Sequence, residues 1–349
     1  MSTVYVFGAG ASFDSGYPLC SDLGGSLPTF MCDSTNPWIR AGGEFFQDRF
    51  GNSPNMEEMI TEIESRVESL KDSREPQERA ERTRLANNRG SLAAALREFF
   101  GTIRDKHSGT YSLFAKSVVK PGDTIVTFNY DDSLDRQLSL RKVWNVSTGY
   151  GFPLGEGEPA SEILLLKLHG SMNWLISIFG GAVHGMFLAN PANSLGGTPV
   201  IHRADLRFLG YEEFEGRVYQ SGGAPPCLIL PGRSKQFFYD TSFGREFSEF
   251  WEGLWNQAKR AMQVSEKVVI CGYSLPVADE RARQLLFDGI RRSTQIEIVS
   301  GSETGRIAQE FRSVGFSNVS EPRGRYFSDW VADIVDVCAE PQSPSSINA

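Results

Sequence analysis

Short runs of apolar residues alternate along the chain with longer stretches in which apolar residues recur every three or four positions. The short runs predict buried strands and the longer stretches predict amphipathic helices. The strand candidates are Val4–Phe7, Ile125–Phe128, Ile163–Leu168, Cys227–Leu230, Val268–Cys271 and Ile296–Val299. This alternation predicts an α/β protein with a Rossmann-like parallel sheet and helices on both faces.

The helical pattern is clearest where Met56, Ile60, Ile63, Val67 and Leu70 follow one another at steps of three and four. Further helices are expected later in the chain, at about Phe243–Val264, Ala278–Ile290, Thr304–Val314 and Tyr326–Val337.

Two stretches interrupt the simple alternation. Residues 19–120 separate the first two strands and are mostly helical in pattern, whereas residues 175–225 are rich in Gly, Asn and Pro and are expected to be loop-like. We interpret both as insertions in one catalytic domain that spans residues 1–340. Residues 341–349 are rich in Pro and Ser and are expected to form a frayed tail.

Composition narrows the class of protein. The 349 residues carry a net charge of −8, which argues against direct nucleic-acid binding because that requires a basic face. The five cysteines include no C-x-x-C pair, so a structural zinc site has no support and reduced thiols in a cytoplasmic protein are expected. We find neither a signal peptide nor an apolar run long enough to span a membrane, and we expect no metal.

The first strand candidate runs directly into Gly8-Ala9-Gly10-Ala11-Ser12. Small residues in such a turn allow backbone N–H groups to approach a diphosphate, and a helix that follows would add partial positive charge. An ordinary tight turn has the same composition. A dehydrogenase would next require a strand that ends in an acidic residue, and Asp33 follows no convincing strand. The Walker pattern of P-loop NTPases is absent as well.

The second strand candidate is followed by Asn129, Asp131 and Asp132. Ligands of open parallel sheets bind at the carboxyl ends of the strands. At least one of the two aspartates is expected to cap the next helix. Asn129 then lies at the tip of the strand, where its amide can donate and accept hydrogen bonds with a sugar hydroxyl.

Two further turns follow strand candidates. His169 follows the third strand candidate. An imidazole at this place can act as a general base near neutral pH, or it can have a structural role by bonding to a loop carbonyl. Gly272-Tyr273-Ser274 follows the strand candidate Val268–Cys271. This turn either supplies backbone donors to a ligand or is a plain turn. Asp279, shortly after it, either caps a helix or reaches a ribose.

Taken in order, these motifs resemble those of the sirtuin family. "GAGAS…SGYP" resembles the opening G-A-G-x-S…G-x-P loop, "TFNYD" the T-Q-N-x-D strand end, "LHGS" the H-G catalytic turn, "GYSL" the late G-T-S-L turn, and "IEIVS" the strand after it. The resemblance implies a sirtuin-like fold and NAD+ as substrate. It also implies roles for individual residues: His169 as general base, Asn129 on the nicotinamide ribose or a water, and Asp131 in support. The implied cofactor-binding residues are Gly8, Ala9, Gly10, Ala11, Ser12 and Gly16 at the diphosphate, with Gly272, Tyr273 and Ser274 at the adenosine or phosphate end.

The chain departs from sirtuin deacylases in three respects. It lacks their zinc module with two cysteine pairs, has Pro18-Leu19-Cys20-Ser21 where they have P-D-F-R, and has Phe128 in place of their Gln. It therefore more closely resembles the zinc-less bacterial sirtuin-like proteins, which are associated with NAD+ hydrolysis in antiphage defence.

The main hypothesis is thus an NAD+ glycohydrolase that forms nicotinamide and ADP-ribose. The alternatives are an NAD-dependent protein deacylase or ADP-ribosyltransferase, and a non-catalytic nucleotide-binding subunit. The resemblance also implies a homo-oligomer that is activated either by self-assembly or by a separate subunit, such as a HerA-type ATPase or an Argonaute.

Overall fold

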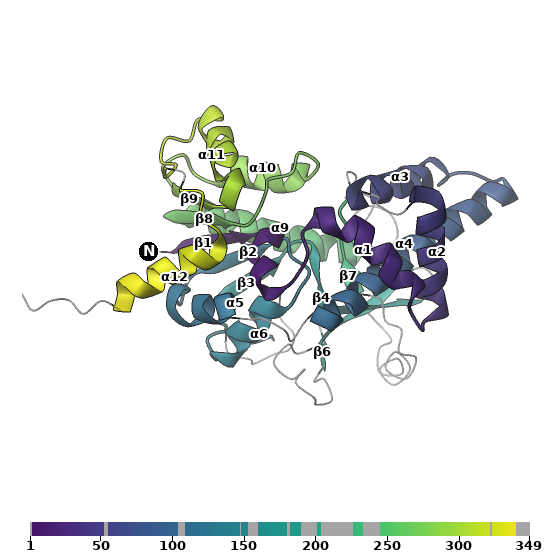
Figure 1. The fold of residues 1–349 in the computed structure, drawn as a ribbon, viewed down its shortest axis with the longest axis horizontal. Helices are drawn as coiled ribbons and strands as arrows, with labels where there is room; N and C mark the ends of the chain where they lie inside the picture. The colour runs from purple at the N-terminus through teal and green to yellow at the C-terminus, as the bar shows by residue number, and fades with distance from the viewer. Residues whose placement is uncertain are drawn as a thin grey trace, which may run out of the picture.

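A five-stranded parallel sheet forms the centre of the computed structural model, which describes residues 2–51, 55–103, 109–146, 148–152, 160–179, 182–189, 201–203, 226–232, 245–321 and 323–339. Its strands lie in the order β3-β2-β1-β8-β9 (Figure 1). Their bounds are β1 Thr3–Phe7, β2 Thr124–Thr127, β3 Leu164–Lys167, β8 Lys267–Cys271 and β9 Gln295–Val299. All four pairings are parallel, so the predicted α/β class with a parallel sheet is confirmed.

Side chains of β1 show why the sheet is covered on both faces. Tyr5 and Phe7 point to one face, where both rings pack edge-on against Phe114. Val4 and Val6 point to the opposite face and are equally buried. The helices that flank the sheet are α5 Gly109–Leu113, the π-helical turn η3 Phe114–Val118, α6 Ser133–Leu140, α9 Arg245–Val264, α10 Glu280–Gly289, α11 Thr304–Ser313 and α12 Phe327–Ala339.

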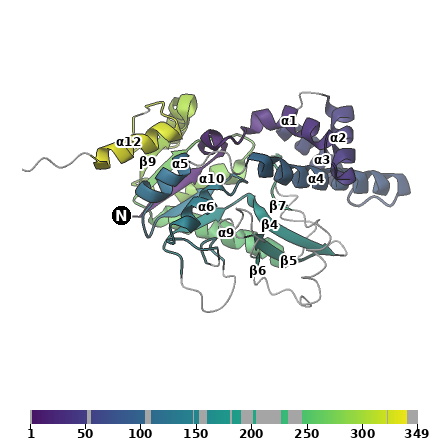
Figure 2. The ribbon, with the colours of Figure 1, turned by 60° about the horizontal axis from the view of Figure 1, so that its bottom comes forward.

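Four of the helices between β1 and β2 gather at one end of the molecule (Figures 1 and 2). Their bounds are α1 Cys20–Cys32, α2 Pro37–Phe50, α3 Met56–Ser69 and α4 Pro76–Ile103. Asn36 and Asn55 begin two of them by accepting bonds from backbone N–H groups of the first turn. These helices pack around a second hydrophobic cluster, whose members include Leu27, Met31, Phe46, Ile60, Ile63, Leu92 and Leu96.

Residues 170–228 contribute a second, antiparallel sheet in the order β6-β5-β4-β7. Its strands are β4 Gly170–Phe179, β5 Ala182–Ala189, β6 Ile201–Arg203 and β7 Pro226–Leu228. The loop-like prediction for residues 175–225 is therefore wrong wherever that stretch is described. The strand predicted at Cys227–Leu230 exists, but it belongs to this sheet and not to the parallel one.

The sequence does contain a hairpin signal in this stretch, and the loop-like prediction overlooked it. Gly180 and Gly181 lie between two apolar runs, and a Gly-Gly pair at such a place is typical of a β-hairpin. β4 and β5 pair antiparallel on either side of it. Helix α4 lies over this sheet and contacts β4 and β7, so the second sheet joins the helical cluster to the rest of the molecule (Figure 2).

Two further expectations are not tested by the structure. The expected tail at 341–349 lies outside them, and the assignment of residues 1–340 to one catalytic domain stays a prediction. None of the described helices combines the length and the apolar character that a membrane span requires.

A buried ion pair connects the parallel sheet to the second sheet. Lys167, the last residue of β3, lies with its Nζ atom 3.0 Å from Oδ2 of Asp135, and both side chains are almost fully buried. The hydroxyl of Tyr150 donates to the same carboxylate and accepts from Nδ2 of Asn173 in β4 at 2.9 Å. A buried charge is tolerated when it is paired and hydrogen-bonded in this way.

We expect Lys167→Met to lower the free energy of unfolding by about 4 kcal/mol, because it leaves the Asp135 carboxylate buried without its counter-charge. Burial already raises the pKa of Asp135 against the opposing effect of Lys167. The loss should therefore shrink as the pH falls through that raised pKa and the carboxyl group takes up a proton. Urea denaturation over a pH series measures this.

The matched control is Lys71→Met, which removes an exposed pair with Glu68 and should leave the urea midpoint nearly unchanged. Equal effects of the two variants would contradict the assignment of Lys167 to a stabilising buried pair.

Candidate functional site

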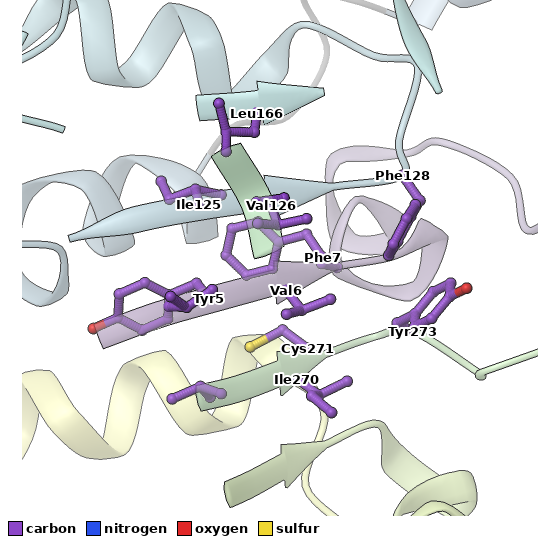
Figure 3. Packing of buried hydrophobic residues seen from close by; sticks show 14 of the residues in the cluster. Tyr5, Val6, Phe7, Ile125, Val126, Phe128, Leu166, Ile270, Cys271 and Tyr273 are labelled. Carbon is purple, nitrogen blue, oxygen red and sulfur yellow. The ribbon is translucent and has the colours of Figure 1, made fainter. Parts of the chain in front are cut away.

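Four turns meet at the carboxyl edge of the parallel sheet. They follow β1 at Gly8, β2 at Phe128, β3 at Leu168 and β8 at Gly272. Because these strands are neighbours and run in the same direction, their carboxyl ends lie together. Figure 3 shows Phe128 and Tyr273 side by side beyond the ends of β2 and β8, where their rings stack with centroids 4.5 Å apart.

The turns after β1 and β8 contact each other backbone to backbone. The Gly8 N–H donates to the Cys271 carbonyl at 3.1 Å, and the Gly10 N–H donates to the Gly272 carbonyl at 2.9 Å. A Cβ atom on Gly8 would lie 2.6 Å from the Tyr273 Cα atom, and one on Gly272 would lie 2.1 Å from the Ala11 nitrogen. Gly272 also has a φ of +58°. Close approach therefore requires glycine here without any appeal to a ligand.

The same hydrogen bonds change the expected phosphate cradle. In addition to Gly8 and Gly10, the N–H groups of Ala11 and Ser12 donate within the turn, to Gly8 and Ala9. A diphosphate would have to replace these bonds or bind other groups of the turn. No α-helix follows directly either, because two short 3₁₀ helices, η1 Ala9–Ala11 and η2 Phe13–Ser15, precede α1. Gly16 ends η2 in the left-handed conformation, with a φ of +89°.

Ser12 is the centre of a buried hydrogen-bond cluster. Its hydroxyl donates to Oδ2 of Asp131 at 2.6 Å and accepts from Nδ2 of Asn129 at 3.0 Å. The same Asn129 nitrogen also donates to the Gly8 carbonyl at 2.9 Å. The Tyr111 hydroxyl lies 2.8 Å from the Ser12 oxygen. The structure thus brings together Ser12, Asn129 and Asp131, as expected from their places at adjacent strand ends.

Burial is the main cause of the pKa shifts in this cluster. Burial raises the pKa of Asp131, while the nearby Lys167 ammonium acts in the opposite direction. Burial also raises the pKa of Tyr111 well above its usual value, and the Asp131 charge adds to the effect. Tyr111 therefore stays a neutral hydroxyl at physiological pH.

His169 lies in the turn after β3 and is buried against aromatic rings. Its ring centroid is 5.0 Å from that of Phe128. Its Nε2 atom is 3.3 Å from Oδ2 of Asp279, within ion-pairing distance. The contact is with a carboxylate, whereas a structural role was expected to use a loop carbonyl. Asp279 also accepts a bond from the Ala282 N–H at the start of α10, so of the two alternatives left open for it, capping is observed.

Other residues singled out in the sequence lie at the margin of this edge or serve the fold. Ser274 is exposed, and its carbonyl accepts from Arg306. Oδ1 of Asp132 lies 3.9 Å from Nε of Arg136, which is one turn later in the chain, in α6. Asp131, by contrast, accepts the Ser133 N–H at 3.1 Å, so one of the two aspartates does support the start of α6.

Sequence reasoning missed three contributors to the site. Tyr111 carried no signal in the sequence. Lys167 carried one, because a charged residue inside the apolar run "ILLLKLHG" must find a partner when the run is buried. The pairing of Asp279 with His169 joins residues 110 positions apart, so only the fold reveals it. Among the described residues, no group of His, Cys, Asp and Glu could hold a metal ion.

No protein-family model matches the chain, and no curated protein matches it in sequence. The solved structures to which it is similar include Sir2 homologues. One, a Sir2 homologue in complex with NAD, has 14% identity and a TM-score of 0.45, covering 97% of this chain and 90% of that one. A Sir2 homologue mutant in complex with 2′-O-acetyl ADP ribose has 12% identity and a TM-score of 0.42, covering 98% and 95%. Sir2Tm bound to a propionylated peptide has 12% identity and a TM-score of 0.38, covering 97% and 93%.

We expect Gly272→Ala to destabilise the protein by about 3 kcal/mol, because the new methyl group would collide with the turn after β1 and the positive φ would be strained. Denaturant unfolding measures the change. Gly122→Ala is the matched control: Gly122 has a φ of +88°, but a methyl group there would meet no other atom within 4 Å. It isolates the strain and should cost only about 1 kcal/mol. A Gly272 variant no less stable than this control would rule out the close contact of the two turns.

Proposed function

We propose that this protein binds NAD+ and hydrolyses its bond between nicotinamide and ribose. The observation that carries the proposal is the convergence of Asn129, Ser12, Asp131 and His169 at the carboxyl ends of adjacent parallel strands. That edge is where open α/β sheets bind ligands. The motifs that resemble those of sirtuins supply the identity of the ligand.

The proposed reaction breaks the bond between C1′ of the ribose and the nicotinamide nitrogen, and the bonding electron pair leaves with nicotinamide as a neutral base. A water oxygen then bonds to C1′ and gives up one proton, so that the products are nicotinamide and ADP-ribose. The protein has to hold the ribose, stabilise positive charge on its ring, and accept a proton.

Each of these tasks has a candidate among the buried residues. His169 accepts the proton, either from a ribose hydroxyl or, through it, from the water. Asn129 already donates to Gly8 and Ser12, so we assign its carbonyl oxygen to the ribose hydroxyl or the water. Asp131 holds Ser12 and lends negative charge to the site.

The diphosphate requires a different placement from the one the sequence suggested. Because the N–H groups of Gly8, Gly10, Ala11 and Ser12 donate within the protein, we place the phosphates on the outer side of the turn. Ala9 is partly exposed there, and Phe13 is 56% exposed. An exposed aromatic ring beside a ligand site is suited to contact a base or a sugar face.

The biological setting rests on the sequence resemblance alone. We propose that the protein is an antiphage effector in the cytoplasm that depletes NAD+ when it is triggered. It would act as a homo-oligomer and be activated by a separate subunit, such as a HerA-type ATPase or an Argonaute.

We expect Asn129→Ala and His169→Ala each to lower NAD+ consumption by the purified protein at least about 100-fold, since each removes a group that acts on the ribose. Chromatography of the products measures nicotinamide and ADP-ribose. Asn318→Ala is the matched control: Asn318 is exposed and donates to the Ser293 carbonyl, so its activity should equal that of the wild type. Circular dichroism checks that all three variants are folded.

Other products would point to the alternatives. An O-acyl-ADP-ribose formed from an acylated peptide and NAD+ would identify a deacylase, and ADP-ribose attached to protein would identify a transferase. NAD+ binding without turnover, by calorimetry, would identify a nucleotide-binding subunit. Full activity in both site variants would refute the assignment of Asn129 and His169.

A further inference from the structure

We propose that Asp279 is the positioning residue of His169: its carboxylate holds the imidazole with the Nε2 proton facing it and leaves Nδ1 as the basic atom. The inference rests on the proposed function for its catalytic consequence. The orientation and tautomer of His169 are properties of the free protein and can be measured without any substrate.

Three groups in the described part of the chain lie against the carboxylate of Asp279, among its other contacts. Its Oδ2 atom lies 3.3 Å from His169 Nε2 and accepts the Tyr273 hydroxyl at 3.1 Å, while Oδ1 accepts the Ala282 N–H at 3.4 Å. Burial raises the pKa of Tyr273 well above its usual value, so Tyr273 stays a neutral donor. Both the histidine and the aspartate side chains are nearly fully buried.

Because an ionised carboxylate presents only lone pairs, it would repel a lone pair on the imidazole nitrogen that lies 3.3 Å from it, and we therefore assign a proton to that nitrogen. In neutral His169 that nitrogen is Nε2, and Nδ1 then holds the lone pair that can accept a proton. When Nδ1 takes up a proton, the carboxylate stabilises the imidazolium ion. This is the arrangement by which a carboxylate orients a histidine base in general.

The loop that carries Asp279 contains a strained residue and is hydrogen-bonded to α10. Leu275, four residues earlier, adopts a φ of +53°, which is strained for a residue with a side chain, and it is buried. Its carbonyl accepts from Nη1 of Arg283 at 3.0 Å, one turn into α10. A strained segment that persists because its surroundings fix it is typical of a functional loop.

The first experiment uses Asp279→Asn. Asparagine caps helices as well as aspartate does, so this variant retains the start of α10, removes the negative charge and introduces an N–H donor. Two-dimensional ¹H–¹⁵N spectra of the imidazole nitrogens report the tautomer, and His169→Gln identifies the signal. We expect neutral His169 to be protonated at Nε2 in the wild type and to lose that preference in Asp279→Asn, whose amide can donate to Nε2.

Asp288→Asn is the matched control, because Asp288 lies exposed on the same helix. It should leave the His169 signal unchanged. An Nε2-protonated His169 in Asp279→Asn, as in the wild type, would overturn the proposal, and so would an Nδ1-protonated His169 in the wild type.

The second experiment is kinetic. We expect Asp279→Asn to lower kcat about 1000-fold with KM changed less than about threefold, because the tautomer of the base is wrong while substrate contacts remain. Asp279→Glu retains a carboxylate and should recover part of both kcat and the Nε2 tautomer, which a merely structural role would not produce. A wild type that consumes no NAD+ would count against the proposed function, whereas the spectra would still decide the pairing.

Discussion

Backbone contact between the turns after β1 and β8 is the constraint on which the arrangement of the site depends. Gly8, Gly10 and Gly272 allow the two turns to approach each other more closely than residues with a side chain would permit. The approach holds the turn that leads to Ser12 against the turn after β8, and the Ser12 hydroxyl accepts from Asn129 and donates to Asp131. It also brings Tyr273 against Phe128, so that one contact orders residues from three strands.

Below this edge, the buried pair of Lys167 and Asp135 fixes the second element of the site. Lys167 precedes His169 by two residues, and its ammonium group donates to the Asp131 carbonyl as well as to Asp135. The turn that carries His169 is therefore linked to the turn that carries Asp131 through a charge that cannot leave its partner without a large desolvation penalty. The same pair reaches β4 through Tyr150 and Asn173, so the antiparallel sheet supports the site although none of the proposed catalytic residues lies on it.

The sequence predicted all five strands of the parallel sheet, because each contains a short apolar run such as Val4–Phe7. It also predicted a strand at Cys227–Leu230, which belongs to the antiparallel sheet instead. It also sufficed to place Asn129, Asp131 and His169 at strand ends. It failed for the second sheet, where a composition rich in Gly, Asn and Pro hid the strands around Gly180 and Gly181. It could not reveal that the N–H groups after β1 bond within the protein, nor that Asp279 faces His169, since both depend on contacts between segments distant in sequence.

The cluster around Ser12 constrains what can bind beside it. Its donors and acceptors are buried and engaged with one another, so an apolar ligand that separated them would leave polar groups unsatisfied, at a cost of about 1–3 kcal/mol for each. A ligand that carries several hydroxyl groups can replace each bond that it breaks. A ribose has this property, with two adjacent hydroxyls that both donate and accept. The polarity of the cluster thus favours a sugar at this edge of the sheet, as the proposed reaction at the nicotinamide ribose requires.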